Sequence, residues 1–203
     1  AEDRPVNDIA KEVALTLLQD FGRQQGGQIN YARLRAPKKT YERWMKWGIV
    51  PRSIDREVVE MMHRTAIGVD HDPDHLLLQG LKTALADGWG GCMISTDITD
   101  ILFGTPKPIQ AEGSFGIFKE DEVNIVIHGH EPLLSEMLVE ASRDPEMLKL
   151  AERTGAQGIQ LSGICCTANE VLMRQGVPSA GNFLQQEIAI TTGAVEAMVV
   201  DVQ

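Results

Sequence analysis

Val123-Asn124-Ile125-Val126-Ile127 is a short run rich in apolar, β-branched residues, which is typical of a strand buried in a parallel sheet. Two further runs have the same character, Gly158-Ile159-Gln160-Leu161-Ser162 and Ala197-Met198-Val199-Val200-Asp201. The segments between these runs have helical patterns, over 132–150 with a break at Asp144-Pro145, over 169–174 and over 182–192. Strands that alternate with helices predict a βαβαβ unit, that is, a Rossmann-like parallel sheet of three strands.

The chain before residue 107 shows a different pattern. Its apolar residues recur at three- and four-residue spacing, which indicates amphipathic helices. These helices are expected over 5–24 and 40–47, from Ser53 onward, from Asp72-Pro73 to a break at Gly88-Trp89-Gly90-Gly91, and over 93–103. Ser53 is a good N-cap, and proline is tolerated in a first helical turn. The fold class is therefore mixed: an all-α domain over 1–106 precedes a Rossmann-like α/β domain over 107–203.

The composition limits the class of protein. Acidic side chains outnumber basic ones by 29 to 19, and the net charge of −10 repels nucleic-acid phosphates and anionic lipids. No window approaches the ~18 consecutive apolar residues of a membrane span, and Ala1-Glu2-Asp3-Arg4 lacks the pattern of a signal peptide. Three cysteines, two of them adjacent, do not make a secreted disulfide framework. We expect a cytoplasmic protein that binds neither nucleic acid nor membrane.

Soft metal-binding side chains gather in two short loops. His128-Gly129-His130 follows the first predicted strand, and Cys165-Cys166 follows the second. The carboxyl ends of parallel strands share one edge of a sheet, and neighbouring or next-neighbouring strands lie roughly 5 to 10 Å apart. Imidazole and thiolate are ligands that zinc, copper, nickel and iron–sulfur centres prefer. The sequence therefore predicts a transition-metal site at this edge, to which each loop supplies at most two of the four ligands that a closed tetrahedral site needs.

Other interpretations of these residues stay open. Two adjacent cysteines before a helix are also found as small buried residues, and His-Gly-His can form a turn whose imidazoles bond to backbone carbonyls. Cys92 is expected to be packed rather than to bind a ligand. His63, His71 and His75 are expected on a solvated face because acidic residues surround them, although an Asp/His metal site at 70–75 is a weaker alternative.

The two loops and their flanking residues resemble the nickel-containing carbon monoxide dehydrogenases, including the dehydrogenase subunits of the bifunctional carbon monoxide dehydrogenase/acetyl-CoA synthase enzymes. The resemblance rests on 126–136, with the His-Gly-His loop, and on Gly163-Ile164-Cys165-Cys166-Thr167-Ala168-Asn169-Glu170. It extends through 86–91, 100–106 and 192–203, and so covers nearly the whole chain. Ala168 departs from the family pattern, which usually has glycine there.

This resemblance implies a nickel–iron–sulfur active site, the C-cluster, in a protein of the hybrid-cluster/carbon monoxide dehydrogenase superfamily. Such an enzyme oxidises carbon monoxide with water to carbon dioxide, two protons and two electrons. The family pattern maps the ligands of the iron outside the cuboidal part of the cluster onto His130 and Cys166. His128 and Cys165 would then hold these ligands or hydrogen-bond to cluster sulfur. The same resemblance implies [4Fe-4S] clusters, ferredoxin as electron acceptor, a homodimer, an acetyl-CoA synthase partner subunit and an anaerobic setting.

The resemblance also implies that this chain is an internal fragment. Family enzymes are much longer, and their next cluster cysteine directly follows the Asp-x-Gln with which this sequence ends. The electron-relay cysteines and the lysine and histidine for proton transfer lie elsewhere, so no catalytic residue is expected here and the isolated chain should be inactive. The alternatives are a non-catalytic scaffold or docking fragment and a hybrid-cluster hydroxylamine reductase, which the Cys-Cys-Thr-x-Asn-Glu loop disfavours. A cysteine–histidine hydrolase lacks a recognisable orienting residue.

Overall fold

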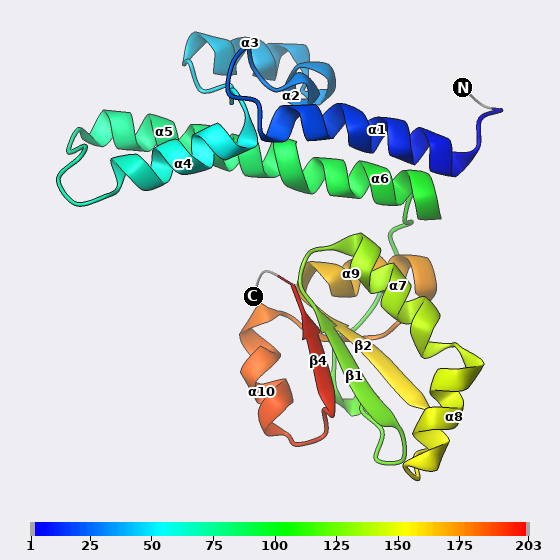
Figure 1. Ribbon diagram of the computed structural model, residues 1–203. Helices are drawn as coiled ribbons and strands as arrows, with labels where there is room; N and C mark the ends of the chain where they lie inside the picture. The colour runs from blue at the N-terminus through cyan, green and yellow to red at the C-terminus, as the bar shows by residue number, and fades with distance from the viewer. Residues whose placement is uncertain (1–2, 202–203) are drawn as a thin grey trace. The chain divides into compact units, whose positions relative to one another are not determined.

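The computed structural model describes residues 3–201 and divides into two compact units, Ala1–Leu102 and Phe103–Gln203 (Figure 1). The first unit is helical and the second contains a parallel sheet, which confirms the predicted fold class. The predicted limits at 106 and 107 lie just beyond the unit boundary. Val202 and Gln203, which end the predicted α/β domain, lie outside the described residues.

The first unit follows the predicted helical pattern closely. Its helices are α1 Val6–Phe21, α2 Asn30–Arg35, α3 Lys38–Lys46, α4 Ile54–Arg64, α5 Pro73–Asp87 and α6 Met93–Phe103, with a π-helical turn η1 Gly88–Cys92. The Ser53 hydroxyl accepts from Arg56 N at 3.3 Å, and Asp72 accepts from Asp74 N at 2.9 Å. Both helix starts therefore have a side-chain cap. Leu17, Tyr31 and Ile94 form the buried core of this unit.

The glycines at 88–91 do not end a helix, contrary to the sequence prediction. They form η1, which joins α5 directly to α6. Gly90 is buried, and a Cβ there would lie 2.7 Å from Ile54 Cδ1 of α4. The glycine therefore lets two helices approach closely, and this packing outweighs the low helix propensity of the residue.

Within residues 3–201 the strands form one parallel sheet with the order β3-β2-β1-β4. Figure 1 shows β2, β1 and β4 side by side in this order. The strands are β1 Val123–His128, β2 Ile159–Ile164, β3 Ser179–Gly181 and β4 Ala197–Val200. Three of them confirm the predicted βαβαβ unit. The sheet has four strands rather than three, because the short β3 pairs with the outer side of β2. The three residues of β3 do not form an apolar run, so the hydrophobic pattern of the sequence did not indicate this strand.

Helices cover both faces of this sheet. They are α7 Pro132–Ser142, α8 Pro145–Arg153, α9 Cys165–Gln175 and α10 Gln186–Thr191, with short 3-10 turns η2 Phe115–Ile117 and η3 Phe183–Gln185. Ile127 packs with Val139 of α7 and Val171 of α9, whereas its neighbour Val126 packs with Ala189 of α10. Burial on both sides explains why apolar residues of β1 point to both faces of the sheet. No described helix combines the length and apolar content needed to cross a membrane.

Gly163 is expected to be essential for the packing of α9 on β2. A Cβ at this position would lie 2.5 Å from Ala168 Cα and 2.9 Å from Ala168 Cβ, so the helix would have to move. We expect Gly163→Ala to lower the free energy of unfolding of the second unit by about 1–3 kcal/mol, measured by chemical denaturation. Gly158→Ala is the matched control, because its Cβ would lie 3.7 Å from the nearest atom, Glu122 Cδ. Equal losses in the two variants would contradict the prediction.

Candidate metal centre

The loops that follow β1 and β2 meet at one edge of the sheet. His128, the last residue of β1, pairs in register with Ile164, the last residue of β2. Beyond the strands, Thr167 N donates a hydrogen bond of 2.9 Å to Gly129 O. His130 directly follows Gly129 in the sequence, and Cys166 directly precedes Thr167. The structure thus brings the two loops together at the backbone level.

His130 and Cys166 are both accessible at this edge. The His130 side chain is 48% exposed, and Cys166 is an exposed free cysteine in the first turn of α9. Cys166 lines an open cavity of about 490 Å³ together with Cys165, Asn169 and residues of the segment 179–185. Neither His128 nor His130 is among the residues that line it. Accessibility is what a residue needs in order to bind a group that arrives from outside this chain.

His128 is a buried structural residue. It is 2% exposed, its Nε2 lies 2.5 Å from Gln186 Oε1 of α10, and its ring meets Phe183 edge-on with centroids 6.4 Å apart. Because an amide oxygen accepts, Nε2 carries the proton in this contact. Nδ1 is buried and has no hydrogen-bond partner. His128 therefore ties the end of β1 to α10 and points one unpaired acceptor into the protein.

Cys165 differs from its neighbour in environment. It is half-buried against the core around Ile164, and its backbone has φ of 67°, a left-handed conformation that is uncommon outside glycine. Burial raises the pKa of the Cys165 thiol and the adjacent Cys166 raises it further, although backbone hydrogen bonds from Cys166 and Phe183 act in the opposite direction. A raised pKa keeps the thiol protonated, which makes Cys165 the less ready metal ligand of the pair.

Asp201 is a residue of this edge that sequence reasoning assigned only to a strand. Its Oδ1 accepts from His130 N at 2.6 Å and its Oδ2 accepts from Glu131 N at 2.5 Å. Its own backbone N donates to His128 O at 3.1 Å. The only signal in the sequence is a carboxylate at the carboxyl end of the third predicted strand. Its contacts depend on the pairing of β4 with β1, which the sequence does not reveal.

The remaining sequence candidates belong to the first unit. His75 is 62% exposed and lies 3.8 Å from Asp70, which fits a solvated surface rather than a metal site. Cys92 is exposed, so the expectation that it is packed is wrong. Within residues 3–201, no group of three or more His, Cys, Asp or Glu side chains could hold a metal ion. The donors of this chain therefore fit a metal group only as part of a larger ligand set.

Comparison with known proteins gives one consistent picture. Residues 1–203 match the model of the Prismane/CO dehydrogenase family. Carbon monoxide dehydrogenase 1 of Methanosarcina acetivorans is 57% identical over 203 residues, which are 100% of this chain and 32% of the relative. A nickel-free crystal structure of carbon monoxide dehydrogenase from Thermococcus sp. AM4 is 54% identical with a TM-score of 0.85, over 100% of this chain and 32% of that one.

A second solved structure is an acetyl-CoA synthase/carbon monoxide dehydrogenase with NiZn[Fe4S4] and NiNi[Fe4S4] clusters in its alpha subunits. It is 44% identical, with a TM-score of 0.85, over 100% of this chain and 30% of that one. This chain therefore spans about a third of the length of the relatives it matches.

Proposed function

Because this chain belongs to the Prismane/CO dehydrogenase family, we propose that it is the part of an anaerobic, nickel-dependent carbon monoxide dehydrogenase that carries two ligands of the C-cluster. The substrates would be carbon monoxide and water, and the products carbon dioxide, two protons and two electrons. The relatives named carbon monoxide dehydrogenase support this assignment along the whole chain. They favour it over a hydroxylamine reductase of the same family.

The proposed ligands of the pendant iron are the His130 imidazole and the Cys166 thiolate. The observation that carries this proposal is the hydrogen bond from Thr167 N to Gly129 O, because it holds together the two loops on which these ligands stand. An imidazole and a thiolate, both accessible, suit an iron or nickel centre better than a hard cation such as magnesium. The two donors that this chain supplies, an imidazole and a thiolate, therefore fit the cluster.

The other residues of the edge have supporting roles in this proposal. His128 fixes the end of β1 through Gln186. Cys165, with its raised pKa, would stay a thiol beside the cluster and could donate a weak hydrogen bond to sulfur. When bound, the cluster would supply the redox chemistry and a Lewis acid for water. The residues of this chain would bind and orient it.

The rest of the enzyme has to come from outside these 203 residues, because the chain spans about a third of the relatives. We propose that the first unit is the end of a helical domain and the second unit most of a Rossmann-like domain. The missing parts would supply further cluster ligands, [4Fe-4S] clusters and the proton-transfer groups. Partners by this proposal are ferredoxin, a second copy of the enzyme and an acetyl-CoA synthase subunit, in the cytoplasm.

A chimera tests the function directly. This chain replaces the matching third of the Methanosarcina acetivorans relative, to which it is 57% identical. We expect the purified chimera to contain nickel and iron and to reduce a low-potential dye with carbon monoxide as the electron donor. The 203-residue chain assayed alone is expected to give no turnover. A well-folded chimera without nickel or activity would favour a non-catalytic scaffold, and turnover by the isolated chain would show that no further ligands are needed.

A further inference from the structure

The carboxylate of Asp201 binds the loop that carries His130 with both of its oxygens. Oδ1 accepts from His130 N at 2.6 Å and Oδ2 from Glu131 N at 2.5 Å, so two successive backbone N–H groups are occupied by one side chain. The backbone of Asp201 completes the link by donating to His128 O at 3.1 Å. Hydrogen bonds to a charged acceptor are stronger than neutral ones. Asp201, which directly follows β4, thus bonds to the loop at His128, His130 and Glu131.

Gly129 leaves space for the Asp201 carboxylate because it has no Cβ. Its φ is +146°, a conformation that residues with a Cβ rarely adopt, and a Cβ at this position would overlap the Asp201 carboxylate. The glycine between the two histidines therefore makes room for the side chain that binds the loop. This fit explains why a turn residue stands between His128 and His130.

The same carboxylate faces the His130 ring. His130 Nδ1 lies 3.7 Å from Asp201 Oδ1, and the Asp201 side chain is only 15% exposed. A carboxylate on that side favours the tautomer with its proton on Nδ1, in which Nε2 is the unprotonated nitrogen. Carboxylates commonly orient metal-bound histidines in this way.

We propose that Asp201 is a positioning residue for His130: it fixes the backbone of the loop and orients the imidazole so that Nε2 faces the metal. The metal part of this inference rests on the proposed function. A plain helix cap would use only the N–H contacts, whereas Asp201 also faces the side chain that is proposed to bind iron.

Two variants and one control test this proposal on the 203-residue chain. Asp201→Ala removes both acceptors and the charge, and Asp201→Asn keeps the size but only one accepting oxygen. Asp144→Ala is the matched control, since the Asp144 carboxylate also accepts from a backbone N–H, that of Glu146 at 2.7 Å, but does so as the N-cap of α8. Amide hydrogen exchange reports on the loop, and ¹⁵N spectra of the His130 ring report on its tautomer. Titration with Co²⁺ reports on metal affinity.

In Asp201→Ala we expect the His130 and Glu131 amides to exchange at least about 10-fold faster. The His130 ring is expected to lose its preference for the Nδ1–H tautomer, and Co²⁺ affinity to fall about 10- to 100-fold. Asp201→Asn should lie between this variant and the wild type, and Asp144→Ala should match the wild type in all three measurements.

The outcomes separate this inference from the proposed function. Faster exchange with an unchanged tautomer and unchanged Co²⁺ affinity would make Asp201 a backbone cap and overturn the proposal. If the wild-type chain takes up no Co²⁺, its two donors need the further ligands of the larger set, and the tautomer measurement alone decides whether Asp201 orients the ring; an unchanged tautomer in Asp201→Ala would then overturn the proposal. Co²⁺ bound with a thiolate absorption band that Cys166→Ala abolishes would support the ligand assignment independently of Asp201.

Discussion

Cys166→Ala is expected to reduce carbon monoxide oxidation by the chimera more than about 100-fold, because it removes a metal ligand rather than a group that supports one. Alanine has no donor atom, and no other thiol of the chain but Cys165 lines the cavity that Cys166 faces. The Cys166 side chain is exposed, so its loss should change the free energy of unfolding by less than about 0.5 kcal/mol. Dye reduction with carbon monoxide, metal content and thermal unfolding measure the three quantities.

Cys165→Ala is the matched control for this prediction. The two cysteines are adjacent, but Cys165 is half-buried and its thiol has a raised pKa. We expect this variant to retain iron and part of the activity. Equal loss of iron and activity in both variants would contradict the choice of Cys166 as the ligand, and a larger loss in Cys165→Ala would reverse it.

Patterns in the sequence predicted the parts of the fold that depend on continuous burial. Val123 to His128 is rich in apolar residues because helices pack on both faces, and this makes the strand recognisable in the sequence. Ser179–Gly181 gives no such pattern because one polar residue and one glycine flank a single alanine. The break predicted at Gly88–Gly91 was wrong. The low helix propensity of glycine is a weak local effect, and the tertiary contact of Gly90 with Ile54 outweighs it.

The candidate site was predictable only in part. Parallel topology alone placed His128-Gly129-His130 and Cys165-Cys166 at one sheet edge. The burial of His128 follows from alternation, because it shares a face with Val126, two residues before it, whose side chain is fully buried. The hydrogen bonds between Asp201 and the His-Gly-His loop were not predictable. They require the register of β4 on β1, and several registers suit a short apolar strand equally well.

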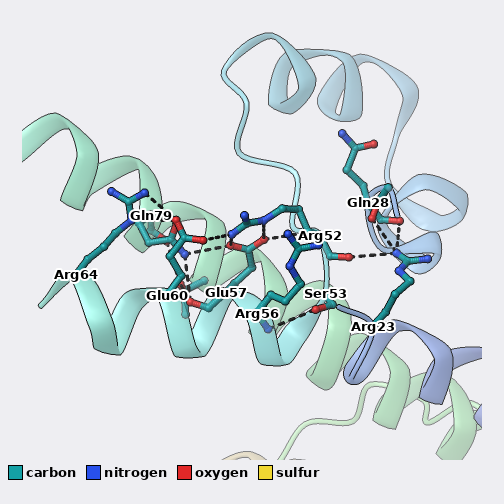
Figure 2. Close-up of polar contacts among 11 residues, drawn as sticks. Arg23, Gln28, Arg52, Ser53, Arg56, Glu57, Glu60, Arg64 and Gln79 are labelled. Atoms are coloured by element: carbon teal, nitrogen blue, oxygen red, sulfur yellow. Dashed lines mark hydrogen bonds and ion pairs between the residues drawn. The ribbon is translucent and has the colours of Figure 1, made fainter. Parts of the chain in front are cut away.

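A buried ion pair in the first unit leads to the largest expected effect on stability. Figure 2 shows Glu57 of α4 in contact with Arg52 and Gln79. Glu57 is fully buried, and its Oε1 accepts from Arg52 N and Arg52 Nε, both at 2.8 Å. Its Oε2 accepts from Arg52 Nη2 at 2.9 Å and Gln79 Nε2 at 3.1 Å. Every acceptor position of the carboxylate faces a donor, which is what allows a charge to be buried there.

The network continues along α4 toward the surface. Glu60 bonds to Arg52 and, at 2.7 Å, to Arg64 (Figure 2). Arg64 also bonds to Asp70 at 2.7 Å. Burial alone would raise the pKa of Glu57, but hydrogen bonds from Arg52 and Gln79 outweigh it, so that the pKa is lowered. Hydrogen bonds from Arg52 and Arg64 lower the pKa of Glu60 from 4.5 to about 2.

These depressed pKa values predict the direction of a pH effect. In the unfolded chain both carboxyl groups titrate near 4.5, so the folded state binds fewer protons than the unfolded state below that pH. The stability that the two groups contribute is therefore complete above about pH 4.5 and is lost as the pH falls, and for Glu60 this loss extends to about pH 2. We expect the first unit to unfold in acid within this window.

Glu57→Ala is expected to lower the free energy of unfolding of the first unit by about 3–5 kcal/mol, because it leaves the Arg52 guanidinium partly buried without its main partner. The variant should also lose part of the dependence of stability on pH below about 4.5, as followed by urea denaturation at a series of pH values. Glu42→Ala is the control, since Glu42 pairs with Lys38 at 4.0 Å on an exposed surface and such pairs contribute little. A Glu57→Ala variant as stable as Glu42→Ala would contradict this prediction. It would mean that the desolvation free energy of the Glu57 carboxylate equals the free energy of its hydrogen bonds, so that the network determines the arrangement of α4 without stabilising it.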